Sequence, residues 1–370
     1  MLGGLRVLEL CAGWAGPLAG RMLAELGADV IKVEPPAGDP LRAVGAPERD
    51  GTGYAFHLVN PNKRSLIADP QSSADLALLE RLARAAEIVL EGDPQPEWLV
   101  AVPRPPAQIR CAVTPFGRTG PLAGAPGADL ILQAITGIMA TTGFDGGAPV
   151  RIGPTVADHG TALMAVVDIV AALCARADTG AGQAIDVAGF DAMISYLNAF
   201  LGSALLTGAA PPRQGNRHTS TAPWNAYPTS DGAVLLCTST EPQWRAVLQL
   251  IEREDALADP CYATVSKRRA NAVDVDALIA AWTSVRATSE VMQLGEAARL
   301  PIAIVAELDD LMHAPAFAER EMIRRLSVPG GEVVVPGSLF AGEGAVDRAA
   351  PALGAGGSDA ARAWLAGTPG

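Results

Sequence analysis

One acidic residue of this sequence stands where it can do chemistry. Asp158 lies between a glycine-rich loop and the start of a long apolar segment, within the stretch from Gly127 to Val187. An acid just before a helix is a favoured N-cap, because its oxygens accept hydrogen bonds from the first backbone amides. An ionised carboxylate is also a nucleophile, and we expect the positive end of the helix to lower its pKa and keep it ionised. By position alone capping is the simpler interpretation, and the two roles are compatible.

A group of glycines near the N-terminus suggests a second kind of site. Gly13, Gly16 and Gly20 follow a predicted strand, and Glu34 ends the next strand, as in folds that bind a dinucleotide. Their spacing is not GxGxxG, so nicotinamide binding is the weaker alternative. Tight packing of the strand against the helix accounts for Gly13 and Gly20. Glu34 is most simply an acid at a strand end, beside Lys32.

Three further positions have both a structural and a functional interpretation. Lys63 and Arg64 precede a strand-like segment and fit a solvated basic pair as well as a functional one. Trp14 lies in a loop between a predicted strand and a predicted helix, where it is well placed to cover a planar ligand. His159 does not form a catalytic pair with Asp158 by adjacency, since neighbouring side chains generally diverge.

The composition limits the classes of function. The 370 residues carry a formal net charge of −12, which argues against a surface that binds nucleic acid. The cysteines and histidines are scattered, without CxxC, HExxH or HxxxH spacing, so we expect neither disulfides nor a metal site. No signal pattern opens the chain, and the most apolar segment (162–175) contains Asp168 and is too short to span a bilayer. We therefore expect a soluble, cytoplasmic protein that binds neither nucleic acid nor membrane.

Apolar periodicity predicts an α/β first half. A strand over 6–10, a helix over 17–26 and a strand over 29–33 form a βαβ unit, which predicts a parallel sheet covered by helices. The pattern continues with a helix over 74–85 and with strands over 87–90 and 108–113. We expect a Rossmann-like arrangement.

The second half begins with helices and ends in a smaller α+β pattern. Helices are predicted over 161–177 and 191–206, with a short strand between them over 184–187, and a glycine- and proline-rich linker follows over 208–217. A hairpin is predicted over 227–237, and another turns at Gly330 and Gly331. Further helices are predicted over 243–252, 273–285, 289–299 and 359–365.

In order along the chain, the motifs resemble class III CoA-transferases, the group that contains formyl-CoA and carnitine CoA-transferases and α-methylacyl-CoA racemases. The resemblance runs nearly end to end. Its segments are RVLEL…AGPLAGRMLAELGADVIKVEPPAGDPLR (6–42), LVNPNKRSL (58–66), FGRTGP (116–121), GADLILQAITGIMATTG (127–143), PVRIGPTVAD (149–158), RADTGAGQAIDV (176–187), YPTSDGAV (227–234), LPIAIVAELDDLMHAPAFAER (300–320) and APALG (350–354).

The resemblance implies a particular architecture. Each subunit is expected to be ring-like, with a Rossmann-like large domain (1–205 and 325–370), a linker (206–221) and a small α+β domain (222–324). Two such subunits are expected to interlock as a homodimer.

The resemblance also implies that Asp158 is the nucleophile. In the transferases the matching aspartate attacks an acyl-CoA thioester, and CoA then passes through an aspartyl thioester to an acceptor carboxylate. Racemases place a histidine at the position of Ala128, so this chain lacks the second acid/base and transfer is favoured over racemisation. The alternatives are a racemase or other acyl-CoA enzyme of the same fold, and a non-catalytic relative that acts as a binding partner.

The family's contacts with coenzyme A, the co-substrate, map by position onto the large domain. The matching residues are Trp14, Ala15, Ala68, Asp69, Gln71, Gly92, Asp93, Gly127, Ala128 and Asp129. Two departures concern the phosphates. Pro35 stands where the family can have a base, and the segment EGDPQPEW (91–98) has no cation.

Overall fold

The chain folds into two compact units. The computed structural model describes residues 1–338, 340 and 347–366. The large unit comprises Met1–Met139, Arg151–Ala210 and Pro315–Gly370, and the small unit comprises Ala140–Val150 and Pro211–Ala314. These limits differ from the predicted ones at three places, of which the first is the linker: residues 206–210 belong to the large unit and 211–221 to the small one. The loop 140–150 belongs to the small unit, where Gly215 donates a backbone hydrogen bond to Gly143 O (2.8 Å), and the chain returns to the large unit at 315 rather than 325.

A six-stranded parallel sheet forms the centre of the large unit, which confirms the predicted α/β class. Its strand order is β3-β2-β1-β4-β5-β6, so the chain builds outward from β1 in one direction and then in the other. In open parallel sheets, ligands bind beyond the carboxyl ends of the strands where this order reverses. The strands are β1 (Arg6–Leu10), β2 (Asp29–Glu34), β3 (Arg64–Ile67), β4 (Ile88–Glu91), β5 (Ile109–Thr114) and β6 (Ala184–Ala188).

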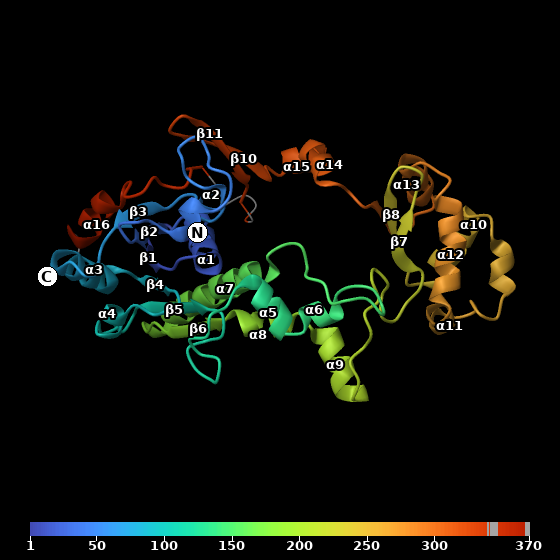
Figure 1. Cartoon of the computed structure of the whole chain (residues 1–370), viewed down its shortest axis with the longest axis horizontal. Helices are drawn as coiled ribbons and strands as arrows, with labels where there is room; N and C mark the ends of the chain where they lie inside the picture. The colour runs from blue at the N-terminus through green and yellow to red at the C-terminus, as the bar shows by residue number, and fades with distance from the viewer. Residues whose placement is uncertain (339, 341–346, 367–370) are drawn as a thin grey trace. The chain divides into compact units, whose positions relative to one another are not determined.

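Helices cover both faces of this sheet (Figure 1). Successive side chains of a strand point to opposite faces, and both faces are apolar here: Val7 packs in the core under α1 (Ala15–Glu25) and α7 (Val156–Thr179), while Leu8 packs under α3 (Ser73–Ala85) and α16 (Gly357–Ala366). The other helical segments of this unit are η1 (Pro40–Ala43), α2 (Tyr54–Val59), α4 (Glu97–Val100), α5 (Asp129–Ile135), α8 (Gly189–Ser195), α9 (Asn198–Thr207) and α15 (Pro315–Glu319), and α6 (Ile138–Thr141) crosses its boundary.

Two helix predictions need correction. The helix expected over 161–177 begins at Val156, so Asp158 lies inside it rather than before it. The single helix expected over 191–206 is divided into α8 and α9, which meet at an angle of 72°. Leu197, at the break, is buried with Met193 in a common apolar cluster, and the chain bends there instead of continuing as one straight helix.

α7 is also longer than the apolar segment seen in the sequence. It has 24 residues and a mean hydropathy of 1.7, and by length and composition such a helix is able to cross a bilayer; α8 and α9 together pass the same test. Core helices of soluble proteins pass it as well. One side of α7 packs on α1 and α8, and its other side is exposed.

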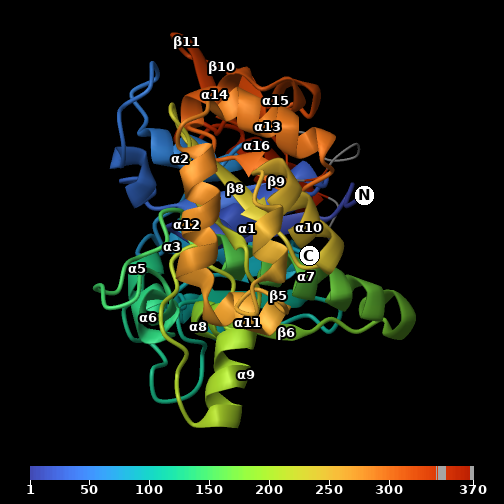
Figure 2. The same cartoon turned by 90° about the vertical axis from the view of Figure 1, so that its right-hand side faces the viewer.

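The small unit has its own sheet and core (Figure 2). The predicted hairpin is present as β7 (Trp224–Pro228) and β8 (Ala233–Cys237), and β9 (Ile302–Ile304) pairs antiparallel with β8. Tyr227 and Trp244 are buried in its core. Its helical segments are α10 (Glu241–Leu250), η2 (Glu254–Ala258), α11 (Val265–Ala270), α12 (Ala272–Thr283), α13 (Thr288–Ala297) and α14 (Leu308–His313). The hairpin predicted at Gly330 and Gly331 lies in the large unit, as β10 (Ile323–Val328) and β11 (Gly331–Pro336).

Candidate active site

A cavity opens at the carboxyl ends of the central strands of the large unit. Its volume is about 660 Å³, and segments 11–16, 92–94, 113–115 and 124–132 line it together with Asp158 and Thr161. The cavity therefore lies at the reversal of strand order between β1 and β4. It brings together most of the predicted site residues: Trp14, Ala15, Gly92, Asp93, Gly127, Ala128, Asp129 and Asp158.

The remaining predicted residues lie beside a second cavity at the same edge of the sheet. Ala68 and Gln71 line this cavity of about 500 Å³, with Leu10, Pro35 and Trp98. Asp69, between the two, accepts a hydrogen bond at Oδ1 from the Gln71 amide (2.9 Å). Consecutive residues of the chain line the two cavities: Leu10 lines the second and Cys11 lines the first.

Asp158 does not cap its helix. Thr155 is the N-cap residue of α7, and Asp158 lies in the first turn, half-buried. Its carboxylate accepts no hydrogen bond from any residue that the structure describes. Burial and the nearby charge of Asp129 raise the pKa of Asp158 to about 6, although His159 acts in the opposite direction. This corrects the expectation of a lowered pKa, because burial outweighs the helix end. At neutral pH the carboxylate is still mostly ionised.

Asp129 carries out the capping that the sequence suggested for Asp158. Its Oδ1 accepts hydrogen bonds from the backbone amides of Ala157 (2.7 Å) and Asp158 (3.3 Å), at the start of α7. Its Oδ2 accepts from Gln133 Nε2 (2.6 Å), one turn further along α5. Gln133 is fully buried and also accepts the Ile152 amide (2.9 Å). Asp129 thus lines the cavity, as predicted, and fixes the backbone on which the Asp158 side chain stands.

No histidine faces Asp158 among the described residues that line the cavity. His159 is exposed, and its Nδ1 lies 2.9 Å from Thr155 O and 3.1 Å from Thr155 Oγ1. Ala128 lines the cavity at the position where racemases have a histidine. Within the described part of the chain, no three His, Cys, Asp or Glu side chains form a group that is able to hold a metal ion.

A cation does reach the turn after β4, although the segment 91–98 contains none. Arg118 donates a hydrogen bond from Nη2 to Gly92 O (2.7 Å), and its guanidinium lies 3.6 Å from Asp93 Oδ1 and 3.5 Å from Glu91 Oε2. Reasoning from the sequence missed this residue. The motif FGRTGP contained the signal, but nothing local connects that motif to a turn more than twenty residues earlier.

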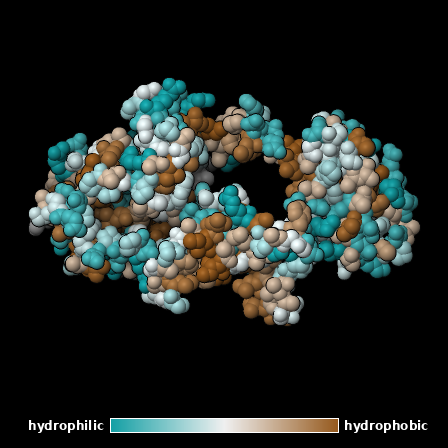
Figure 3. Space-filling view, in the orientation of Figure 1, coloured by the Kyte–Doolittle hydropathy of each residue, from teal (hydrophilic) through white to brown (hydrophobic). Residues whose placement is uncertain are grey.

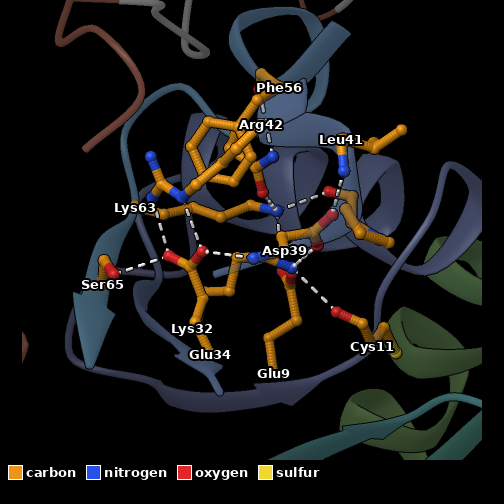
Figure 4. A network of polar contacts seen from close by, with 12 residues as sticks. Glu9, Cys11, Lys32, Glu34, Asp39, Leu41, Arg42, Phe56, Lys63 and Ser65 are labelled. Atoms are coloured by element: carbon orange, nitrogen blue, oxygen red, sulfur yellow. Dashed lines mark hydrogen bonds and ion pairs between the residues drawn. The ribbon is translucent and has the colours of Figure 1, made fainter. Parts of the chain in front are cut away.

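Beside the cavity lies a buried ionic network (Figure 4). Lys63 is 3% exposed and pairs with Glu9, so it is not the solvated base that its sequence suggested as one interpretation. Arg64, half-buried, pairs with Asp29.

Glu34 belongs to the same network rather than to a nucleotide site. Its side-chain partners are Arg42 and Ser65 rather than the neighbouring Lys32. Arg42 donates to it from Nε and Nη2 (2.7 Å each), and Ser65 donates to Oε1 (2.5 Å). Both of its oxygens are thus already bonded, which removes the acid that a dinucleotide ribose would need.

The chain closely resembles proteins of known family. A sequence model described as CoA-transferase family III matches residues 2–356. A succinate–glutarate CoA-transferase of Agrobacterium fabrum is 34% identical over 350 residues, which cover 91% of this chain and 87% of that protein. A succinyl-CoA:mesaconate CoA-transferase of Haloarcula marismortui is 34% identical over 89% of this chain and 86% of its own length. A crystal structure of a CAIB/BAIF family protein from Brucella suis superposes with a TM-score of 0.85 at 34% identity, covering 98% of this chain and 99% of that one.

Proposed function

Because the chain belongs to CoA-transferase family III, we propose that it moves CoA from an acyl-CoA thioester to a carboxylic acid with Asp158 as the nucleophile. One observation carries the assignment of Asp158. Its carboxylate faces a cavity of about 660 Å³ with no hydrogen-bond partner among the described residues, and its pKa of about 6 leaves it ionised at neutral pH. A carboxylate that is buried but unpaired is free to attack.

The reaction then proceeds in balanced steps. An Asp158 oxygen attacks the thioester carbonyl, the carbon–sulfur bond breaks, and CoA thiolate leaves a mixed anhydride on the enzyme. The thiolate attacks the aspartyl carbonyl, which releases the donor acid and leaves an aspartyl-CoA thioester. The acceptor carboxylate displaces the thiolate to form a second anhydride, and the thiolate attacks the acceptor's acyl carbon to give the product and free Asp158. Each attack generates an oxyanion, for which backbone amides of nearby glycine loops are the expected donors.

Relatives indicate which cargo to test first. The two relatives described above are named for succinate or succinyl-CoA together with glutarate or mesaconate. We therefore propose a dicarboxylic acid as acceptor and a succinyl-type thioester as donor.

The two cavities suggest how a long thioester is held. A CoA thioester is extended, and the predicted contacts divide between the cavity of Asp158 and the one lined by Ala68 and Gln71. Trp14 is half-buried on the core and faces the first cavity, where it offers an apolar wall. Arg118 brings a positive charge to the turn Gly92–Asp93. Coenzyme A enters as co-substrate, and the mechanism requires no metal.

Transfer is favoured over racemisation by the residue at position 128. Two-sided proton exchange at a Cα needs a second acid/base opposite Asp158, and Ala128 supplies none. Deuterium incorporation at Cα of a 2-methylacyl-CoA would support the racemase instead.

The surface of the large unit supports a homodimer. Large apolar side chains of α5, α7 and α9 are exposed, and Figure 3 shows hydrophobic surface, in brown, over α9. Val167 is 60% exposed, Leu205 77% and Leu206 89%. Soluble proteins rarely leave such a patch uncovered, and the resemblance supplies the occupant, a second copy interlocked with the first. Light scattering of the purified protein tests this, with twice the chain mass expected. The cytoplasmic location stays a prediction.

An exchange assay tests the function directly. The protein is incubated with succinyl-CoA and each of a panel of mono- and dicarboxylic acids, and new thioesters are separated and weighed. We expect a new acyl-CoA with at least one dicarboxylate and none with the Asp158→Ala variant. No exchange across a broad panel of donors and acceptors would favour the non-catalytic relative.

A further inference from the structure

The turn between β1 and α1 forms one wall of the candidate active site and is held from behind by two buried lysines. We propose that Lys32 and Lys63 are positioning residues for this turn, residues 11–17, and that Glu9 fixes both of them. The inference rests on the proposed function in one respect, namely that this wall contacts the thioester.

Lys32 holds the start of the turn. It projects from β2 and is 1% exposed. Its Nζ donates to Cys11 O (2.7 Å) and to Glu9 Oε1 (3.0 Å), and lies 2.7 Å from Asp39 Oδ2. Three oxygens thus surround one ammonium group, and one of them is the carbonyl at which the turn leaves β1.

Lys63 holds the end of the turn. Its Nζ donates to Pro17 O (2.7 Å) and to Asn60 Oδ1 (2.9 Å), and lies 2.7 Å from Glu9 Oε2. Pro17 is in the first turn of α1, immediately beyond the last residue of this segment that lines the cavity.

Glu9 joins the two lysines. Its side chain is fully buried, and one oxygen faces each lysine. The approach depends on Gly20, because a Cβ there would overlap Glu9 Oε2. This is the physical reason for the glycine, in keeping with the packing interpretation of its sequence.

The arrangement goes beyond what stability requires. Burying two cations with two carboxylates, Glu9 and Asp39, is costly, and apolar side chains of similar size often stabilise a core as well. What this cluster adds is that charge-assisted hydrogen bonds, which are stronger than neutral ones, hold the carbonyls of both Cys11 and Pro17. All of the residues between those two carbonyls, 12–16, line the cavity.

Amide hydrogen exchange and steady-state kinetics test the proposal together. The Leu18 amide donates to Trp14 O (2.9 Å) across the first turn of α1, so its exchange reports opening of this segment. In Lys63→Met we expect exchange of the Leu18 amide to rise about tenfold, as one charged hydrogen bond is lost. We also expect KM for the acyl-CoA to rise more than kcat falls, because the wall binds the thioester and does not react. Lys32→Met is expected to act in the same direction.

A buried cation outside this network, Arg21 on α1, provides the matched control. Arg21 is 5% exposed, pairs with Glu25 and donates to the carbonyls of Leu58, Pro336 and Gly337, away from the cavity. Arg21→Met is expected to lower stability while leaving exchange of the Leu18 amide and KM unchanged. If Lys63→Met does not fold, the double variant Glu9→Gln/Lys63→Met removes both charges, keeps the Lys32–Asp39 pair and still releases Pro17 O.

Two outcomes would overturn the positioning role. One is unchanged exchange of the Leu18 amide in the folded lysine variants, and the other is an equal rise in the Arg21→Met control. Failure of the proposed function is distinguishable, because it appears as absence of transfer by the unaltered protein, while the exchange measurement needs no activity.

Discussion

Two carboxylates of the large unit, Glu9 and Asp158, have opposite surroundings. Asp158 lines the cavity, and Glu9 lies two residues before Cys11, which also lines it. Glu9 is fully buried at the end of β1, and each of its oxygens faces a lysine. Asp158 is half-buried in the first turn of α7, and another acid, Asp129, is the charged group that affects its pKa most.

The difference separates a structural acid from a reactive one. A buried charge persists when it is paired, and Glu9 is paired twice. Asp158 has burial without a cation, which raises its pKa and leaves its lone pairs free. Asp158, the less buried of the two acids, is therefore the one whose carboxylate is available to react. Its surroundings disfavour the ionised form and so lower the stability of the fold, a cost that a purely structural residue would not carry.

The largest effect is expected from removing the reactive acid. In Asp158→Ala we expect the transfer rate to fall by roughly 10³-fold or more, since the nucleophile itself is lost. Exchange of CoA between succinyl-CoA and the preferred acceptor is the measurement. The unfolding midpoint should not fall, because Asp129 rather than Asp158 caps α7. Transfer at the original rate would show that Asp158 is not the nucleophile.

Removing the charge of the structural acid is expected to affect stability most. Glu9→Gln leaves two buried lysines facing an amide, and breaking such a pair from one side costs about 3 kcal/mol or more. Urea unfolding at pH 7 measures the loss. A change below about 0.5 kcal/mol, typical of a surface substitution, would mean that the network contributes little.

The same chemical change at Asp158 is expected to have the opposite sign. The pKa of Asp158 is about 6 in the folded protein, above the ordinary value of 3.8, so the folded state binds the proton more tightly. The protonated group stabilises the fold below pH 3.8, and this stability is lost as the pH rises to 6 and is absent above it. Asp158→Asn should therefore stabilise the protein by about 1–2 kcal/mol at pH 7.5, less than the full shift implies because water reaches the group. Unfolding at pH 5 should show a smaller gain. A loss of stability at pH 7.5 would contradict this reasoning.

The smallest effect concerns the pH dependence of transfer. The ionised carboxylate is the reactive form, so kcat/KM should rise with pH and reach half its maximum near pH 6. Asp129→Asn removes the neighbouring charge while its amide oxygen still accepts the two α7 amides, and the midpoint should move down by about half a unit to one unit. A midpoint that stays near 6 in the variant would show that burial alone sets the pKa.

Much of the large unit follows from local sequence. The segment RVLEL is a short, apolar-rich run, and the predicted bounds of β1, 6–10, are those observed. Helix α3 carries a clear start signal at Ser72, whose side chain accepts the Asp75 amide, and it begins one residue before the predicted position. Such elements are encoded by neighbours along the chain.

The candidate site was less accessible to the same reasoning, because its contacts are distant in sequence. Asp129 caps a helix that begins 27 residues later, in place of a residue at the helix start, and no rule of sequence spacing predicts such a distant cap. Lys63 looks exposed beside Arg64 in the sequence, and only the pairing of β3 with β2 and β2 with β1 brings it to Glu9. Arg118 reaches the turn after β4 in a comparable way. Residue types indicated the chemistry, and the sheet order determined the partners.

Chemical trapping of the intermediate on Asp158 tests most directly whether this residue is the nucleophile. The protein is mixed with succinyl-CoA, quenched with hydroxylamine, digested and analysed by mass spectrometry, with Asp158→Asn as the control. An aspartyl anhydride or thioester is expected to yield a hydroxamate on Asp158, dependent on the thioester and absent from the variant. Transfer that proceeds while Asp158 remains unmodified would contradict the account.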